Sequence, residues 1–239
     1  MMTLHEAILA RHSVRKYNDK PVPEHILKLL HEKISKINAE AGLHIQLVTG
    51  EPKSFKGINS YGMFSGVRNY FVVAGSRKLA PDSTCPIEDL SERAGYYGEQ
   101  LVLLCQQSGL NTCWAGATYR KIPGTFTLEK DEHIVCYIAV GYGEDQGKER
   151  KRKSPEEVSD VSDITPPWYR AGVEAAILAP TAVNQQKFQI RFVSGKDAGG
   201  KCRISIRPTF SLAGYTKVDL GIVKYHFETG AGTEHFEWV

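Results

Sequence analysis

Hydrophobic residues recur at the three- and four-residue spacing of a helix in several stretches of the chain. A capping box opens the first stretch, because Thr3 can cap a helix and Glu6 lies three residues further on. Gly42 and Gly109 follow the second and third stretches, and glycine commonly takes the left-handed position after a helix. The pattern predicts helices over residues 3–11, 23–42, 86–108, 166–178 and 218–229.

Short apolar runs between these stretches predict strands over residues 45–48, 70–74, 134–140, 188–193 and 202–206. The run at 70–74 is apolar at every position, so we expect it to be buried on both faces. Residues 50–68 and 110–124 show neither pattern and are predicted to be loops. Helices and strands are mixed without strict β-α-β alternation, which favours an α+β fold with a helix-covered sheet.

A polar segment between Gly141 and Pro167 divides the chain, since it contains almost no apolar residue. We therefore predict an N-terminal half over residues 1–150, a basic and polar linker over 151–165, and a C-terminal half over 166–239. On each side of the linker a helix ends at a polar corner, and a strand and a longer helix follow. This shared order weakly indicates two duplicated halves.

Composition narrows the class of protein. The 239 residues are 41% hydrophobic and 24% charged, which excludes wholesale disorder, collagen and coiled coils. No apolar run approaches the ~20 residues of a membrane helix. The five cysteines are odd in number and lack CxxC spacing, which argues against a disulfide framework or a zinc site. With no export signal in view, we expect a cytoplasmic protein.

Two basic segments are candidate anion sites. In the corner Arg11–Arg15 (RHSVR) two arginines flank a hydroxyl, which suits a phosphate, although cations at the end of a helix are an equally good explanation. Lys148–Lys153 (KERKRK) can be a solvated face, an anion clamp or a nucleic-acid patch. No aromatic residue is interleaved in this run, and no second basic cluster accompanies it, so nucleic acid is not expected.

The segment Ala179–Gln186 (APTAVNQQ) is uncharged and ends in three amide side chains that could read a flat heterocycle. The glycines at 141–147 have the wrong spacing for a dinucleotide-binding loop. No nucleophile–base pair and no G-x-S-x-G elbow is present. If the chain is an enzyme, a cofactor is expected to carry the chemistry.

Taken together, these segments resemble the FMN-dependent nitroreductase family. The signatures are A-x-x-x-R-x-S-x-R at 7–15, the helix and loop at 98–116, a strand ending at 141–143 before the basic run, and A-P-[ST]-x-x-N-x-Q at 179–186. In ordinary members the last motif follows the N-terminal helices, but here residues 37–42 lack it. Because members are homodimers with FMN at the interface, this layout resembles a subgroup with fused, rearranged halves, a pseudo-dimer in one chain.

The resemblance implies a nitroreductase-like α+β fold, with a mixed, largely antiparallel sheet and two pseudo-symmetric halves. It also implies the cofactor-binding residues, position by position. Positions for the FMN phosphate, ribityl chain and pyrimidine edge are matched by Arg11, His12, Ser13 and Arg15. Positions that pack on the flavin are matched by Pro180, Thr181, Ala182 and Asn184. A second phosphate-binding cluster is matched by Arg152 and Lys153, and the backbone facing flavin N5 by Ala115 and Gly116.

The activity implied is an NAD(P)H oxidoreductase with a ping-pong mechanism, in which hydride passes through flavin N5 to nitroaromatic, quinone or similar acceptors. No catalytic side chain and no metal are required, and Arg15 is expected beside N1 and O2 of the flavin. The alternatives are a non-redox flavin or nucleotide binder on the same scaffold and a basic nucleic-acid module. We expect no membrane partner, and a monomer with an internal pseudo-dimer or a loose homodimer.

Overall fold

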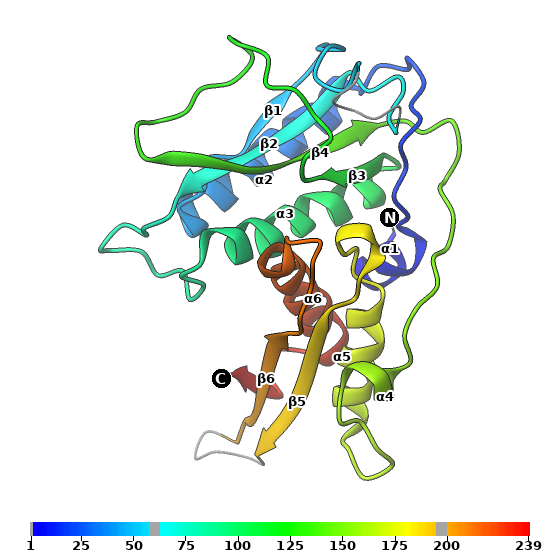
Figure 1. Ribbon diagram of the computed structural model, residues 1–239, viewed down its shortest axis with the longest axis vertical. Coiled ribbons are helices and arrows are strands. Elements are labelled where there is room, and N and C mark those ends of the chain that lie inside the picture. The colour runs from blue at the N-terminus through cyan, green and yellow to red at the C-terminus, as the bar shows by residue number, and fades with distance from the viewer. Residues whose placement is uncertain (1, 58–62, 195–199) are drawn as a thin grey trace.

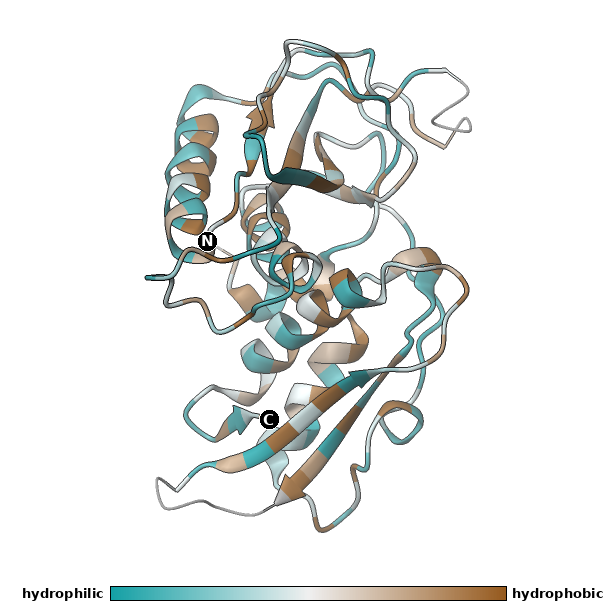
Figure 2. Cartoon of the chain, turned by 60° about the vertical axis from the view of Figure 1, so that its left-hand side comes forward, coloured by the Kyte–Doolittle hydropathy of each residue, from teal (hydrophilic) through white to brown (hydrophobic). Residues whose placement is uncertain are grey.

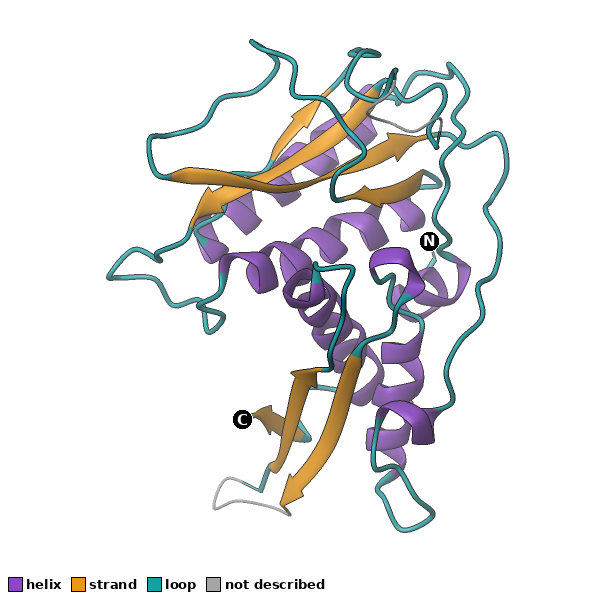
Figure 3. Cartoon of the chain, viewed as in Figure 1, coloured by secondary structure: helices purple, strands orange, loops and turns teal. Residues whose placement is uncertain are grey.

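Two separate sheets, each covered by helices, build the part of the protein that the computed structural model describes, residues 2–57, 63–194 and 200–239 (Figure 1 and Figure 3). The strands are β1 (Gln46–Val48), β2 (Asn69–Ser76), β3 (Asn111–Ala115), β4 (Glu132–Gly141), β5 (Phe188–Ser194), β6 (Cys202–Pro208) and β7 (Phe236–Trp238). The first sheet has the order β1-β2-β4-β3 and is antiparallel throughout. The second has the order β5-β6-β7, with β7 parallel to β6.

The helices are α1 (Leu4–Ala10), α2 (Glu24–Ala41), α3 (Leu90–Gln107), α4 (Pro155–Val158), α5 (Pro167–Ile177) and α6 (Thr216–Ala231), with a 3₁₀ turn at Ala182–Asn184. The predicted capping box at Thr3 and Glu6 is present, and Gly42 ends α2 in the left-handed conformation. Helix α3 begins later than predicted, because the Asp89 side chain accepts hydrogen bonds from the backbone of Ser91 and Glu92. Among the described residues, no helix combines the length and apolar character needed to cross a bilayer.

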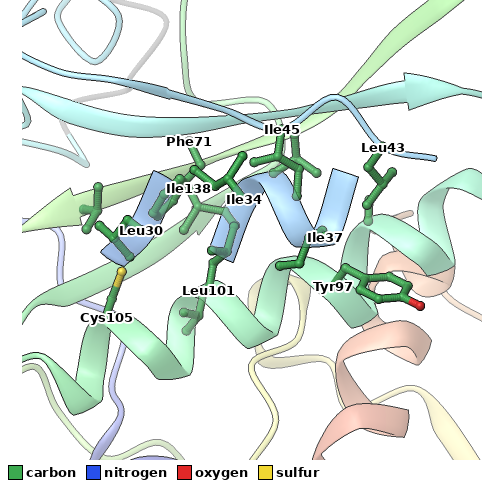
Figure 4. Packing of buried hydrophobic residues seen from close by; sticks show 14 of the residues in the cluster. Leu30, Ile34, Ile37, Leu43, Ile45, Phe71, Tyr97, Leu101, Cys105 and Ile138 are labelled. Atoms are coloured by element: carbon green, nitrogen blue, oxygen red, sulfur yellow. The ribbon is translucent and has the colours of Figure 1, made fainter. Parts of the chain in front are cut away.

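The first sheet is buried on both faces, but by different kinds of structure. Phe71 of β2 and Ile138 of β4 pack against α2 and α3, where Leu30, Ile34 and Leu101 meet them (Figure 4). The other face packs against loops, and its core residues include Val14, Tyr17, Phe55, Tyr70, Val72 and Tyr137. The prediction that 70–74 is buried on both faces is therefore confirmed, in an antiparallel sheet.

The second sheet is covered on one face only. Phe188 and Ile190 of β5 and Ile204 of β6 are buried against α5 and α6, while Arg191, which follows Ile190, is exposed. Figure 2 shows the resulting bands of alternating hydropathy along this hairpin. This half therefore depends on α6 for its core, and α6 in turn lies against α3.

Helices α3 and α6 cross at very short range because glycines lie at the contact. A Cβ built on Gly95 of α3 would lie 2.0 Å from the carbonyl oxygen of Val218, and one built on Gly221 of α6 would lie 2.0 Å from that of Glu92. No side chain larger than hydrogen fits between these backbones. The two reciprocal glycines thus hold the C-terminal half against the central helix of the N-terminal half.

Three local predictions differ from the structure. Residues 111–115 were expected in a loop but form β3, whose polar residues Asn111 and Thr112 are buried and hide the usual strand pattern. The last strand, β7, was not expected, because a three-residue segment is too short for a pattern to show. Residues 155–158, inside the predicted linker, form α4, and Val158 is fully buried.

The division of the chain into two pseudo-symmetric halves joined by a linker stays a prediction. The two sheets differ in strand number and order, so they add no support for duplicated, pseudo-symmetric halves. The boundaries 1–150, 151–165 and 166–239 likewise remain as the sequence suggests them. The five cysteines are free and buried.

The glycine crossing gives a stability prediction. Gly95→Ala should lower the free energy of unfolding by about 3 kcal/mol, because separating α3 from α6 outweighs the roughly 1 kcal/mol that alanine gains in helix propensity. Urea unfolding of the purified variant measures the change. Ser91→Ala, in the first turn of the same helix, is the control and should stay within about 0.5 kcal/mol of the parent protein. A stabilised Gly95→Ala variant would contradict the close crossing.

Candidate functional site

The N-terminal corner Arg11–Arg15 lies beside strand β3. Arg11 ends α1 with an extended backbone, and its N–H donates to the carbonyl of Ala7. Two residues on, the backbone of Ser13 forms a parallel bridge with Thr112, and Val14 N–H donates to the carbonyl of Thr112 at 3.1 Å. These contacts fix the corner against the edge strand of the first sheet.

The loop after α5 reaches the same place from the C-terminal half. Three of its residues, Val183, Asn184 and Gln186, have left-handed φ angles of 47°, 56° and 45°. Residues other than glycine rarely adopt this backbone conformation, so contacts with the surrounding structure must stabilise it. Asp219 of α6 supplies two of them, accepting from Ala182 N–H at 2.9 Å and from the Gln185 side-chain amide at 2.6 Å.

The amide side chains of this loop bind the basic run. The side-chain amides of Asn184 and Gln186 donate to the carbonyl of Lys151 at 2.8 and 3.2 Å, and Lys153 N–H donates to the side-chain oxygen of Gln186 at 2.9 Å. No pattern in the sequence predicted a direct contact between these two segments. Their side chains thus fasten protein to protein, which is a different use from the reading of a heterocycle that the sequence suggested.

A small basic cavity lies between the corner, the loop and the run. Its volume is about 90 Å³. Its polar lining is supplied by Arg11, His12, Ser13, Arg15, Lys148, Arg150, Arg152, Thr181 and Asn184. No carboxylate belongs to the described residues that line it. Five cationic side chains around one small space form a site for an anion.

Burial disfavours the charged forms of two side chains that line this cavity. Desolvation lowers the pKa of Arg11, and nearby Glu99 partly opposes the shift. The Nε of Arg11 is buried and has no hydrogen-bond partner. Partial burial also lowers the pKa of His12, as do the charges of Arg11 and Arg152. Each of these effects would be relieved by a negative group in the cavity.

A larger, mostly apolar cavity of about 280 Å³ adjoins the basic one. The two share five lining residues, namely Ser13, Arg15, Pro180, Thr181 and Val183. Its aromatic and aliphatic lining includes Met63, Phe64, Trp114, Ala182, Tyr215 and Ile222. Arg15 and Thr181 therefore stand at the junction of a cationic space and an apolar one.

The structure brings together most of the residues predicted for the site. Arg11, His12, Ser13, Arg15, Arg152, Pro180, Thr181, Ala182 and Asn184 all line one or both cavities. Gly116 lines the apolar cavity under the ring of Tyr215, whereas Ala115 is buried within β3 and lines neither.

Lys153 is the predicted cationic residue that the structure places apart from the two cavities. Its Nζ donates to the backbone carbonyl of Gln186 at 2.8 Å, and it lines neither cavity. In the extended run, alternate side chains point to opposite sides, so Lys148, Arg150 and Arg152 face the cavity while the chain at Lys151 and Lys153 binds the loop.

Several lining residues were missed from the sequence. Lys148 and Arg150 belong to the run that was noticed, and a two-residue alternation would have selected them with Arg152. Asp219 and Tyr215 gave no signal, because a lone acid or tyrosine near a predicted helix start is common. Trp114 belongs to the segment 98–116 that carries part of the family resemblance, but the sequence pattern did not predict that its side chain lines a cavity.

Burial of Asp219 gives a pH prediction. Desolvation raises the pKa of its carboxyl to about 6, although the hydrogen bonds from Gln185 and Ala182 oppose the shift. The folded protein therefore holds this proton more tightly than the unfolded chain, so ionisation reduces the free energy of unfolding as pH rises from about 4 to above 6. Relative to the parent, Asp219→Asn should become more stable across that window by up to about 3 kcal/mol. Urea unfolding at several pH values measures the difference.

Glu6→Gln is a control with the opposite sign. Hydrogen bonds from Thr3 lower the pKa of Glu6, so its stabilising contribution is present at neutral pH and is lost on acidification. Relative to the parent, Glu6→Gln should become less stable as pH rises. A stability difference between Asp219→Asn and the parent that does not vary with pH would contradict the assignment for Asp219.

Solved structures share this fold. A crystal structure of a "putative nitroreductase" from Thermotoga maritima aligns with TM-score 0.60 and 24% identity, over 95% of this chain and 82% of that chain. A "putative nitroreductase in complex with fmn" from Desulfovibrio desulfuricans aligns with TM-score 0.52 and 16% identity, over 68% of this chain and 98% of that one. Another, also in complex with FMN, from Exiguobacterium sibiricum, aligns with TM-score 0.50 and 17% identity, over 68% and 98%.

These likenesses confirm the predicted nitroreductase-like α+β fold. No curated protein matches the chain. A model of the family described as "Putative TM nitroreductase" matches residues 3–231, nearly the whole sequence. The chain therefore belongs to this nitroreductase family, as its motifs indicated.

Proposed function

We propose that this protein is an FMN-dependent oxidoreductase that takes hydride from NADH or NADPH and passes it to nitroaromatic, quinone or similar acceptors. The observation that carries the proposal is the continuity of the two cavities, a small cationic space that opens into a larger apolar one at Arg15 and Thr181. FMN has this same division, with a phosphate dianion at one end and a flat ring at the other. The FMN named in the descriptions of two structural relatives agrees with it.

The residues present fit this cofactor. The cationic lining of the basic cavity, which includes Arg11, suits the phosphate. The aromatic side chains of Phe64, Trp114 and Tyr215 suit a planar ring. Gly116 lets the Tyr215 ring pack directly on the backbone at the apolar cavity, since a Cβ there would lie 2.4 Å from that ring.

When bound, FMN would supply the hydride chemistry, and this chain would bind, orient and shield it. Arg15 lines both cavities, so its guanidinium can place positive charge between the phosphate and the ring. The loop at 180–186, held by Asp219 and the basic run, closes one side of the apolar cavity. One open apolar site favours a ping-pong order, in which nicotinamide leaves before the acceptor enters.

The test begins with purified protein reconstituted with FMN. Anaerobic addition of NADH or NADPH should bleach the visible absorption of the flavin, and a quinone or nitroaromatic added afterwards should restore it. The two half-reactions proceeding separately would support the ping-pong order. Protein that binds FMN but is reduced by neither nucleotide would favour the non-redox flavin binder. Protein that binds no FMN would overturn the proposal. Assembly as a monomer or loose homodimer stays a prediction.

The alternation of the basic run gives a matched pair of variants. Arg152→Ala removes a charge that faces the basic cavity, and hydrogen bonds to charged groups contribute about 1.5–3 kcal/mol, so FMN should dissociate about ten- to hundredfold more readily. Lys151→Ala removes the same charge from an exposed side chain one position away and should change the dissociation constant about twofold at most. Fluorescence titration with FMN measures both. Equal losses of FMN affinity in the two variants would contradict the assignment of Arg152 to the cavity side of the run and of Lys151 to the opposite side.

A further inference from the structure

A buried cluster of polar side chains lies behind both cavities, where α1, α3, β3 and α6 meet. At its centre the carboxylate of Glu99 is fully buried. Its Oε2 accepts from the indole N–H of Trp114 at 2.9 Å, and its Oε1 lies 3.0 Å from Nε2 of His226. The Nε of Arg11 lies 4.0 Å from the same Oε1. Each of these three contacts therefore presents a hydrogen-bond donor or a cation to the carboxylate.

The surroundings of His226 define where its protons lie. Its Nδ1 is 3.1 Å from the backbone carbonyl of Ala175, which can only accept, so Nδ1 carries a hydrogen. The 3.0 Å contact between Nε2 and Oε1 of Glu99 then needs one further proton, which the two side chains share. With Arg11 included, the cluster has a net charge of +1, directed toward the basic cavity.

Glu99 lines neither cavity, but it contacts one lining residue of each. Arg11 lines the basic cavity, and Trp114 lines the apolar one. Trp114 is also held from behind, because its ring packs on Gly98, where a Cβ would lie 2.5 Å from the indole. One carboxylate on α3 thus contacts a residue of the cationic space and a residue of the ring space, and His226 of α6 holds that carboxylate in place.

We propose that Glu99, clamped by His226, is a positioning residue that aims Arg11 at the phosphate of FMN while it holds Trp114 beside the ring. This proposal rests on the FMN-binding function proposed above. It assigns α6 a role in cofactor recognition, since the C-terminal half sets the arginine of the N-terminal corner through one buried carboxylate. Arg11 reaches the cofactor directly, whereas Glu99 acts only through its neighbours.

The variant Glu99→Gln tests this role cleanly because it is nearly isosteric. The amide oxygen can still accept from Trp114, and the amide N–H can donate to Nε2 of a neutral His226. The amide hydrogen takes the place of the proton that Glu99 shares with His226, so the local charge stays at +1. Long-range attraction for phosphate is then unchanged, and the specific loss is the anionic partner of Arg11.

The experiment compares FMN with riboflavin, which has the same ring but no phosphate. We expect Glu99→Gln to weaken FMN binding about tenfold and to leave riboflavin binding within about twofold, so that the preference for FMN falls. A merely structural role would weaken both flavins alike.

Glu92→Gln is the matched control. Glu92 also lies on α3 and also pairs with α6, its Oε1 being 2.6 Å from Nζ of Lys224, but it lines neither cavity. It should leave the FMN-to-riboflavin preference unchanged. If Glu99→Gln does not fold, His226→Gln replaces it as the test, and the preference for FMN should fall in the same direction.

Each outcome of this experiment either supports or contradicts the role proposed for Glu99. A lower preference for FMN in Glu99→Gln, with an unchanged preference in Glu92→Gln, supports the proposal. A parent protein that binds FMN, together with a Glu99→Gln variant of unchanged preference, overturns this inference and leaves the proposed function standing. A parent protein that binds neither flavin overturns both.

Discussion

The close crossing of α3 and α6 is the constraint on which the rest of the structure depends. Gly95 and Gly221 remove the side chains that would hold the two helices apart. Only at this separation can the fully buried side chains of Glu99 and His226 meet, with Nε2 3.0 Å from Oε1. The same contact carries the loop after α5 to the corner after α1, so both cavities exist because two helices touch (Figure 1).

Charge is distributed around the site in two layers. The basic cavity is lined by cations. Glu149 of the basic run pairs with Arg152 at 3.1 Å, and two further carboxylates lie behind the wall of the cavity or beneath the loop. Glu99 stands behind Arg11, and Asp219 lies under the loop at 180–186, where burial raises its pKa. A carboxylate inside the cavity would compete with an anionic ligand, whereas one behind it can orient an arginine and keep the cavity open to anions.

Local signals in the sequence predicted much of the fold. The capping box at Thr3 and Glu6, the left-handed Gly42 and the apolar run of β2 each depend on neighbouring residues and were recognised. Strand β3 was missed because its polar residues Asn111 and Thr112 are buried through contacts made elsewhere in the chain. The sequence did not separate Arg152, which lines the basic cavity, from Lys153, which does not, because the loop that binds Lys151 and Lys153 lies about thirty residues further on.

The sequence by itself determined the family, the α+β class and which segments carry the site, because motifs such as R-x-S-x-R and A-P-[ST]-x-x-N-x-Q need particular residue types at short spacing. Only the tertiary structure decided that Lys153 turns away while Arg150 faces inward, and that Glu99 links Arg11 with Trp114. The physical reason is distance along the chain. Capping and hydrophobic periodicity act over a few residues, whereas the buried contact between Glu99 and His226 forms only after two helices have packed.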